Sequence, residues 1–280
     1  MERVLNGIVM VLAAIFETLE SILGWILSAI AFVIELVLCV PVIGRLLAWV
    51  LAIVQMLYLF VFGILDTIMG LCGLRPEKKL RVCTIILADE NGQPLTAAAS
   101  LVPLLQNAVD VFKQEANVRV VPAGPFHYTS PFGSNETATE DWIQVRNKPS
   151  RKRILDLGGE VASLAADLID IGGDYNLMAN TEYFYPAWRR VIGYGAPITV
   201  LAIRSMGQGI GRSLGPLTDY LVIDASGGGD NTLIAHEMGH ACYLWHVSNS
   251  GLMHPYSGRG TSLNWWQRSI VRSSRHVTYF

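Results

Sequence analysis

The first quarter of the chain is almost free of charge, which restricts what it can fold into. Residues 46–65, LLAWVLAIVQMLYLFVFGIL, form an uncharged apolar run. About 20 such residues are what a helix needs to cross a bilayer. Residues 21–44 form a second apolar stretch, and Pro41 with Gly44 favour a turn between the two stretches. We therefore predict an all-α, membrane-spanning helical hairpin over residues 1–74.

The few polar and small residues of this segment are not scattered. At about 100° per residue, those of each predicted helix fall on one narrow face. They are Glu2, Asn6, Glu17, Glu20, Ser21, Gly24, Ser28 and Glu35 in the first helix, and Arg45, Ala48, Ala52, Gln55, Gly63 and Asp66 in the second. Such stripes indicate burial against protein or water instead of lipid. Two interpretations follow: the stripes pack within the hairpin, or they join residues 1–74 to further copies of the chain or to another membrane subunit.

From Arg75 onward the composition is that of a globular domain, so we predict one domain over residues 1–74 and a second over 75–280. The formal net charge of -2 argues against a nucleic-acid partner, because neutralising phosphates needs a concentrated positive face. Basic residues next to an apolar segment favour the cytoplasmic side of a membrane. Here they are Arg75, Lys78, Lys79 and Arg81. We expect an integral protein of the cell membrane, in contact with the lipid bilayer, whose soluble domain lies on the cytoplasmic side.

Hydrophobic periodicity predicts alternating strands and helices in the soluble domain. The predicted strands cover residues 80–88, 118–121, 198–203 and 219–224. The predicted helices cover residues 101–116 and 160–171. Residues 122–153 are rich in Pro, Gly, Ser and charge, so we expect a long surface loop there.

The segment HEMGHACYLWHVSNSGLMHP, which begins at His236, carries the chemistry. His236 and His240 are four residues apart, so on a helix both imidazoles project from one face and can bind one metal ion. Glu237 lies beside the first histidine, where it can reach a water molecule without being a ligand. The pattern predicts a metal-dependent hydrolytic site.

A catalytic zinc ion takes three protein ligands and keeps a fourth position open. No Asp or Glu follows Glu237 in the chain, so a third ligand downstream of it must be a histidine. From the residues alone, three candidates remain for this position: His246, His254 and His276.

The segment resembles the metzincin clan of zinc metallopeptidases. The motif of that clan, H-E-x-x-H-x-x-G-x-x-H, matches His236, Glu237, His240 and His246. The sequence SGLMHP, which contains Met253, resembles the methionine turn that forms a hydrophobic floor beneath the metal in the clan. The resemblance implies that the three histidines bind Zn²⁺, with His246 as the third ligand.

The resemblance also implies a fold and an activity. The fold is an α+β catalytic domain with a mixed β-sheet, an active-site helix and a C-terminal helix, the last expected over residues 261–274. In the implied reaction zinc lowers the pKa of a water molecule, and Glu237 takes the proton and passes it to the departing amine. His254 and Tyr256 would contact the substrate or the oxyanion. The substrate would be a protein or peptide.

Tyr243 stands where members of the clan commonly carry glycine. On an unbroken helix His246 would lie about 15 Å along the axis from His236, so the chain must leave the helix between His240 and His246. A left-handed Tyr243 costs on the order of 1 to 2 kcal/mol. Either metal binding and packing hold Tyr243 in that conformation, or a different turn displaces His246.

The leading interpretation is a membrane-anchored zinc endopeptidase that hydrolyses peptide bonds of protein substrates. The alternative is a catalytically silent scaffold, in which a metalloprotease-like domain serves for binding and residues 1–74 serve for oligomerisation. Zinc content and cleavage of an unfolded protein distinguish these two functions.

Overall fold

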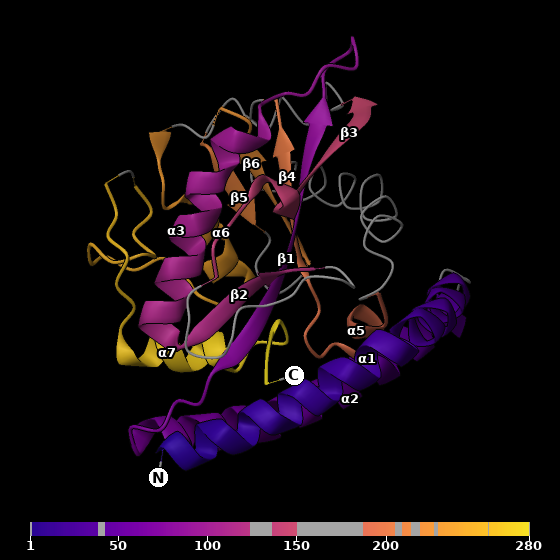
Figure 1. Cartoon of the computed structure of the whole chain (residues 1–280), viewed down its shortest axis with the longest axis vertical. Helices are drawn as coiled ribbons and strands as arrows, with labels where there is room; N and C mark the ends of the chain where they lie inside the picture. The colour runs from indigo at the N-terminus through magenta and orange to yellow at the C-terminus, as the bar shows by residue number, and fades with distance from the viewer. Residues whose placement is uncertain are drawn as a thin grey trace.

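The computed structural model describes residues 2–38, 43–123, 136–149, 187–204, 209–213, 219–226, 229–256 and 258–279 (Figure 1). Two long helices precede a domain that combines a mixed sheet with helices. This coarse architecture is the one expected from the sequence. The helix predicted over 160–171 lies outside the described residues.

The described strands form a seven-stranded mixed sheet at the centre of the domain. They are β1 (Lys78–Ala88), β2 (Val118–Pro122), β3 (Ile143–Pro149), β4 (Ile198–Ile203), β5 (Gly211–Ser213), β6 (Tyr220–Asp224) and β7 (Val277–Thr278). The main order is β2-β1-β4-β6-β5, and β3 and β7 also pair with β1. The pairs are parallel except β5 with β6 and β7 with β1. All four predicted strands are present, and β5 forms an edge of the sheet.

The surface loop predicted over 122–153 is wrong in part, because β3 runs through that segment. β3 pairs in parallel with the second half of β1, starting where Ile143 lies opposite Thr84. Trp142 and Ile143 anchor the strand, and both are buried. The polar composition around these two apolar residues made the segment look like a loop.

Helices α3 (Ala98–Ala116) and α6 (Leu233–Ala241) pack against one another beside the sheet. Their apolar side chains and alternate residues of β1, β4 and β6 make one hydrophobic core. The H-E-x-x-H motif lies on α6, which packs against α3 on one side and against the sheet on another. The last helix, α7 (Trp265–Arg272), falls inside the C-terminal helix expected over 261–274.

The apolar segment folds as α1 (Glu2–Leu38) and α2 (Ile43–Leu71), which lie side by side along one edge of the domain (Figure 1). Within the described residues, one stretch of helix is long and apolar enough to cross a membrane, Ile53–Leu71. In α1 the criterion is met only by two segments, Ala14–Glu20 and Ile22–Ile34, which meet at an angle of 57°. These features are weak evidence for a membrane location.

Described members of both polar stripes contact the mixed-sheet domain, namely Glu20 in α1 and Asp66 in α2. Arg189, on the short helix α5 (Ala187–Ile192), donates two hydrogen bonds of 2.7 Å to the carboxylate of Glu20 in α1. Arg272 of α7 donates two bonds of 3.0 Å to the carboxylate of Asp66 in α2. Neither of the two interpretations of the stripes anticipated this arrangement.

The basic residues used to orient the chain are largely buried in the same contact. Lys78 lies 3.1 Å from Asp66, and Arg81 lies 4.0 Å from Glu20. Lys78, Lys79 and Arg81 are at most 8% exposed. They therefore do not form a free basic cluster beside a membrane, and the reason for expecting a cytoplasmic domain no longer holds.

Candidate metal centre

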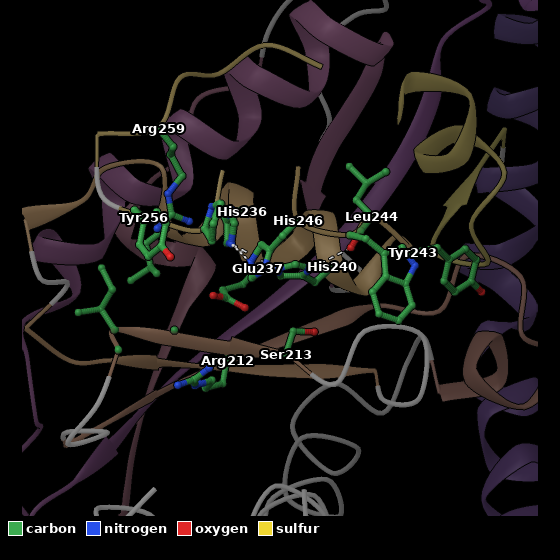
Figure 2. A pocket seen from close by; sticks show the side chains of 16 residues that line it. Arg212, Ser213, His236, Glu237, His240, Tyr243, Leu244, His246, Tyr256 and Arg259 are labelled. Carbon is green, nitrogen blue, oxygen red and sulfur yellow. Dashed lines mark hydrogen bonds between the residues drawn. The ribbon is translucent and has the colours of Figure 1, made fainter. Parts of the chain in front are cut away.

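Three histidines converge at the end of α6. The Nε2 atom of His240 lies 3.2 Å from that of His236 and 3.0 Å from that of His246, and the remaining pair is 3.3 Å apart. Figure 2 shows the three rings next to Glu237. Of the three histidines that the residues alone left open as third ligand, His246 is the one in this cluster. The group could hold a metal ion.

The hydrogen bonds of the rings define which nitrogens are free for a metal. The Nδ1 atom of His236 bonds to the carbonyl of Leu252 at 2.7 Å, and that of His240 bonds to the carbonyl of Leu244 at 2.8 Å. A carbonyl only accepts, so both Nδ1 atoms carry the proton and both Nε2 atoms present lone pairs. Burial lowers the pKa of His236 to about 3 and that of His240 to about 4, so both rings are neutral near pH 7.

The distances fit a zinc ion. Three nitrogens that each lie about 2.0–2.1 Å from a tetrahedral ion are separated by roughly 3.3–3.4 Å from one another. The Nε2 separations of 3.0 to 3.3 Å come close to this value. Converging lone pairs repel each other unless a cation lies between them, so the arrangement is suited to a bound cation.

Tyr243 makes the turn that brings His246 back. Its φ of 73° lies in the left-handed region, so the first of the two alternatives for this residue is the one observed. Its N–H bonds to the carbonyl of His240 at 2.9 Å, and the N–H of Leu244 bonds to that of Gly239 at 3.0 Å. This pair of bonds is the Schellman motif, which normally places glycine at this position. The chain therefore leaves the helix directly after the second histidine.

Met253 lies under α6, the helix that carries His236 and His240. Met253 is fully buried, and a Cβ added to Gly239 would lie 2.6 Å from its sulfur. The turn also holds the ligands, because Leu252 accepts from His236 and the carbonyl of Met253 accepts from Val247, next to His246. Gly239 is thus required for the close approach of helix and turn.

Glu237 is a buried carboxylate that points into the same space. None of the described residues hydrogen-bonds its Oε2 atom. Burial raises the pKa of Glu237 to about 8, and the positive charges of Arg259 and Arg212 oppose this rise. A divalent cation held by the histidines would lower the pKa of Glu237 again and favour the carboxylate, which is the form that accepts a proton.

An open cleft of about 870 Å³ leads to the histidines and Glu237. The edge strand β5 lines one side through Arg212 and Ser213 (Figure 2). A Cβ on Gly211 of β5 would lie 2.6 Å from Oε1 of Glu237, so glycine allows the strand to approach the carboxylate. The cleft therefore leaves both the three histidines and the carboxylate of Glu237 accessible from outside.

The two residues predicted to contact a substrate, His254 and Tyr256, lie in different surroundings in the structure. Tyr256 lines the cleft and is 72% exposed. His254 does not line it and packs against the ring of Tyr256 with 5.6 Å between ring centroids. His276 is fully buried and bonds to the carbonyl of Ala196 at 2.7 Å, far along the chain from the motif. Tyr256 alone of these three keeps its place beside the cleft.

Sequence analysis missed several cleft residues, including Arg212, Trp245 and Arg259. Arg259 pairs with Asp230 at 3.0 Å, and Asp230 accepts a 2.9 Å bond from the N–H of Thr232 at the start of α6. The only sequence signal for Arg212 was the glycine-rich stretch around it, which hid the strand β5. Nothing in the sequence indicated Arg259, because it lies outside both the histidine motif and the SGLMHP segment.

A scan against protein-family models finds no match for this chain, and a search of the curated proteins finds no significant match. The functional interpretation therefore rests on the residues of the motif and on the geometry described above.

Proposed function

We propose that this chain is a membrane-anchored, zinc-dependent endopeptidase of metzincin type. The observation that carries the proposal is the convergence of His236, His240 and His246 beside the buried carboxylate of Glu237 in an open cleft. The position of Met253 beneath α6 and the apolar pair α1 and α2 add support for the clan and for the membrane location.

The residues would divide the reaction between them. The three histidines would hold Zn²⁺, which as a Lewis acid polarises a carbonyl oxygen and lowers the pKa of water. Glu237 would take the proton from the attacking water at its free Oε2 and return it to the nitrogen of the departing amine. The edge strand β5 and the exposed ring of Tyr256 would position an extended peptide across the cleft.

The proposal is tested on the full chain, purified in a mild detergent and loaded with zinc. Cleavage of a generic unfolded protein and the zinc content are measured for the wild type, Glu237→Gln and His246→Ala. We expect Glu237→Gln to retain zinc and to lose cleavage by a factor of about 10² or more. We expect His246→Ala to lose both. Glu140→Gln, which changes an exposed carboxylate, is the matched control and retains both.

The same experiment addresses the alternative function. A wild-type protein that binds one zinc ion but cleaves no substrate would identify a silent scaffold. Cleavage that persists unchanged in Glu237→Gln would exclude the mechanism proposed for that residue.

A further inference from the structure

The hairpin of α1 and α2 is polar toward the protein and apolar toward its surroundings. Its buried residues include Glu20, Gly24, Ser28 and Asp66, of which Glu20 and Asp66 pair with arginines of the mixed-sheet domain. Its exposed side chains are large and apolar along both helices. They include Val4, Ile8, Leu19, Trp25, Ile30 and Val33 of α1, and Val50, Leu57, Phe60, Ile64 and Ile68 of α2.

The described part of this exposed surface has few polar groups. Among the described side chains of the two helices, Thr18 is the one exposed residue with a hydroxyl, amide or charged group. Its hydroxyl donates to the carbonyl of Ala14 at 2.8 Å, the way a hydroxyl is satisfied without water. In α1 the exposed side chains cover more than half of the circumference. The largest apolar patch on a typical soluble monomer covers only about 300–600 Å².

The domain covers the middle of the hairpin, and this restricts how the hairpin can meet a membrane. Its contacts run along α1 from Phe16, whose ring lies 6.4 Å from that of Trp188, past Glu20. On α2 they run from Gln55, which donates to the carbonyl of Val191 at 3.0 Å, to Gly70, which adjoins Ser269. The apolar stretch identified by composition, Ile53–Leu71, is therefore the part of α2 that holds the domain.

The parts of the helices outside this contact are too short to cross a bilayer. At 1.5 Å per residue, residues 43–54 of α2 extend about 18 Å, and residues 2–15 and 21–38 of α1 extend about 21 Å and about 27 Å. The hydrocarbon core is about 30 Å thick. A crossing would have to detach the hairpin, which would leave Arg189, Arg272 and Lys78 without their carboxylates.

We propose that the hairpin lies in the plane of the membrane, with its exposed apolar face immersed in one leaflet, and does not cross the bilayer. This inference rests on the membrane location within the proposed function, and it does not depend on zinc binding or peptidase activity. Helices that are polar on one side and apolar on the other bury the apolar side about 5–10 Å into the boundary between headgroups and acyl chains. The mixed-sheet domain would then stand directly on the membrane surface.

Lipid fits this surface better than a second copy of the chain. A protein partner covers a bounded patch with a polar rim. Here the described apolar side chains run from Val4 to Val33 of α1 and from Val50 to Leu71 of α2, and they cover more than half of the circumference of α1. A fluid can cover such a curved surface, and one flat partner cannot.

The depth of single residues in the bilayer tests the proposal. The full chain, with Cys39 and Cys72 replaced by serine, is reconstituted in phosphatidylcholine vesicles. Spin labels are attached to Ile8→Cys, Leu19→Cys or Ile30→Cys. These positions are 11 residues apart on one stripe of α1. Collision rates with oxygen and with a water-soluble nickel complex give the depth of each label.

An in-plane hairpin places the three labels at one shallow depth, within a few Å of each other. A crossing helix separates the outer two by about 33 Å of depth along its axis, so a progression through the bilayer centre would overturn the proposal. Labels with no oxygen enrichment above that of Glu140→Cys, an exposed position in the domain, would also overturn it and would favour a protein partner. Zinc content and cleavage, measured on the same samples, report separately on the peptidase proposal.

Discussion

Tyr243 is the residue on which the third metal ligand depends. Its φ of 73° is unfavourable for a side chain with a Cβ, at a cost of about 1–2 kcal/mol. The two bonds of the Schellman motif and the burial of Leu244 offset this cost, since Leu244 is 3% exposed. The strain is thus sustained by contacts on both sides of the turn.

The strain at this position can be measured by comparing Tyr243→Gly with Tyr243→Ala. Both substitutions remove the ring and its hydroxyl, so their difference reports the backbone alone. We expect the glycine variant to be more stable than the alanine variant by about 1 kcal/mol, because glycine adopts positive φ at no cost.

If residue 243 had a right-handed helical conformation, the alanine variant would instead be more stable than the glycine variant, by about 1 kcal/mol. Chemical denaturation of the zinc-loaded proteins gives the two free energies of unfolding. An alanine variant as stable as the glycine variant would contradict a left-handed Tyr243.

Glu237 should release a proton when zinc binds. With a pKa of about 8 in the absence of metal, it is mostly protonated at pH 7, and the added positive charge lowers the pKa. His236 and His240 are already neutral at this pH, since burial lowers their pKa values to about 3 and 4. We therefore expect the carboxyl group of Glu237 to release roughly one proton per zinc ion bound at pH 7.

Calorimetric titration in buffers of different ionisation enthalpy counts these protons. Glu237→Gln is the control, and zinc binding to it should release about one proton fewer than zinc binding to the wild type, because a zinc-bound water contributes to both proteins. Equal proton release by the two proteins would show that the carboxylate of Glu237 is ionised before the metal arrives.

At the scale of elements, two arginines hold the hairpin on the domain. The Asp66 carboxylate receives bidentate bonds from Arg272 and a 3.1 Å bond from the hydroxyl of Tyr279, and Lys78 lies beside it. Both Asp66 and Arg272 are at most 3% exposed. Removal of one partner of such a buried pair leaves an uncompensated charge, which is more costly than the pair itself is favourable.

We expect Asp66→Asn to lower the free energy of unfolding by about 3–5 kcal/mol. Its amide keeps the shape of the side chain but leaves Arg272 and Lys78 buried without a negative partner. Asp141→Asn changes an exposed carboxylate and should alter stability by less than about 0.5 kcal/mol. Thermal and denaturant unfolding in detergent measure both, and equal effects of the two substitutions would argue against the contact between α2 and α7.

At the scale of the whole molecule, the hairpin and the mixed-sheet domain share one set of buried contacts. Lys78, Arg189 and Arg272 all belong to the domain and all lose their carboxylate when residues 1–74 are absent. The hairpin is therefore a part of the fold as well as the apolar surface of the molecule.

A chain that begins at Arg75 should consequently fold poorly. We expect it to aggregate or to unfold at a lower temperature than the full chain, by a margin at least as large as that of Asp66→Asn. Circular dichroism and zinc content of the truncated protein measure this. A truncated protein that keeps the melting temperature and the zinc of the full chain would show that the contact contributes little.

The sequence by itself determined the local features of this protein. Periodicity gave four strands and the helix α3, because residues with alternating or three-to-four spacing have one face to bury wherever they occur. The spacing of His236, Glu237 and His240 placed these side chains correctly on α6, since a helix fixes the directions of residues three or four apart. The absence of later carboxylates narrowed the third ligand to three histidines.

The tertiary structure decided what depends on distant segments meeting. The left-handed turn at Tyr243 exists because Leu244 and Met253 pack against Gly239, and no local rule favours tyrosine there. Arg259 reaches the cleft through Asp230. Amphipathic patterning showed that the hairpin has a polar face, but the partner of that face, Arg189 and Arg272, lies more than 150 residues away in the chain. Periodicity records which side of a helix is buried, and only the folded chain records what buries it.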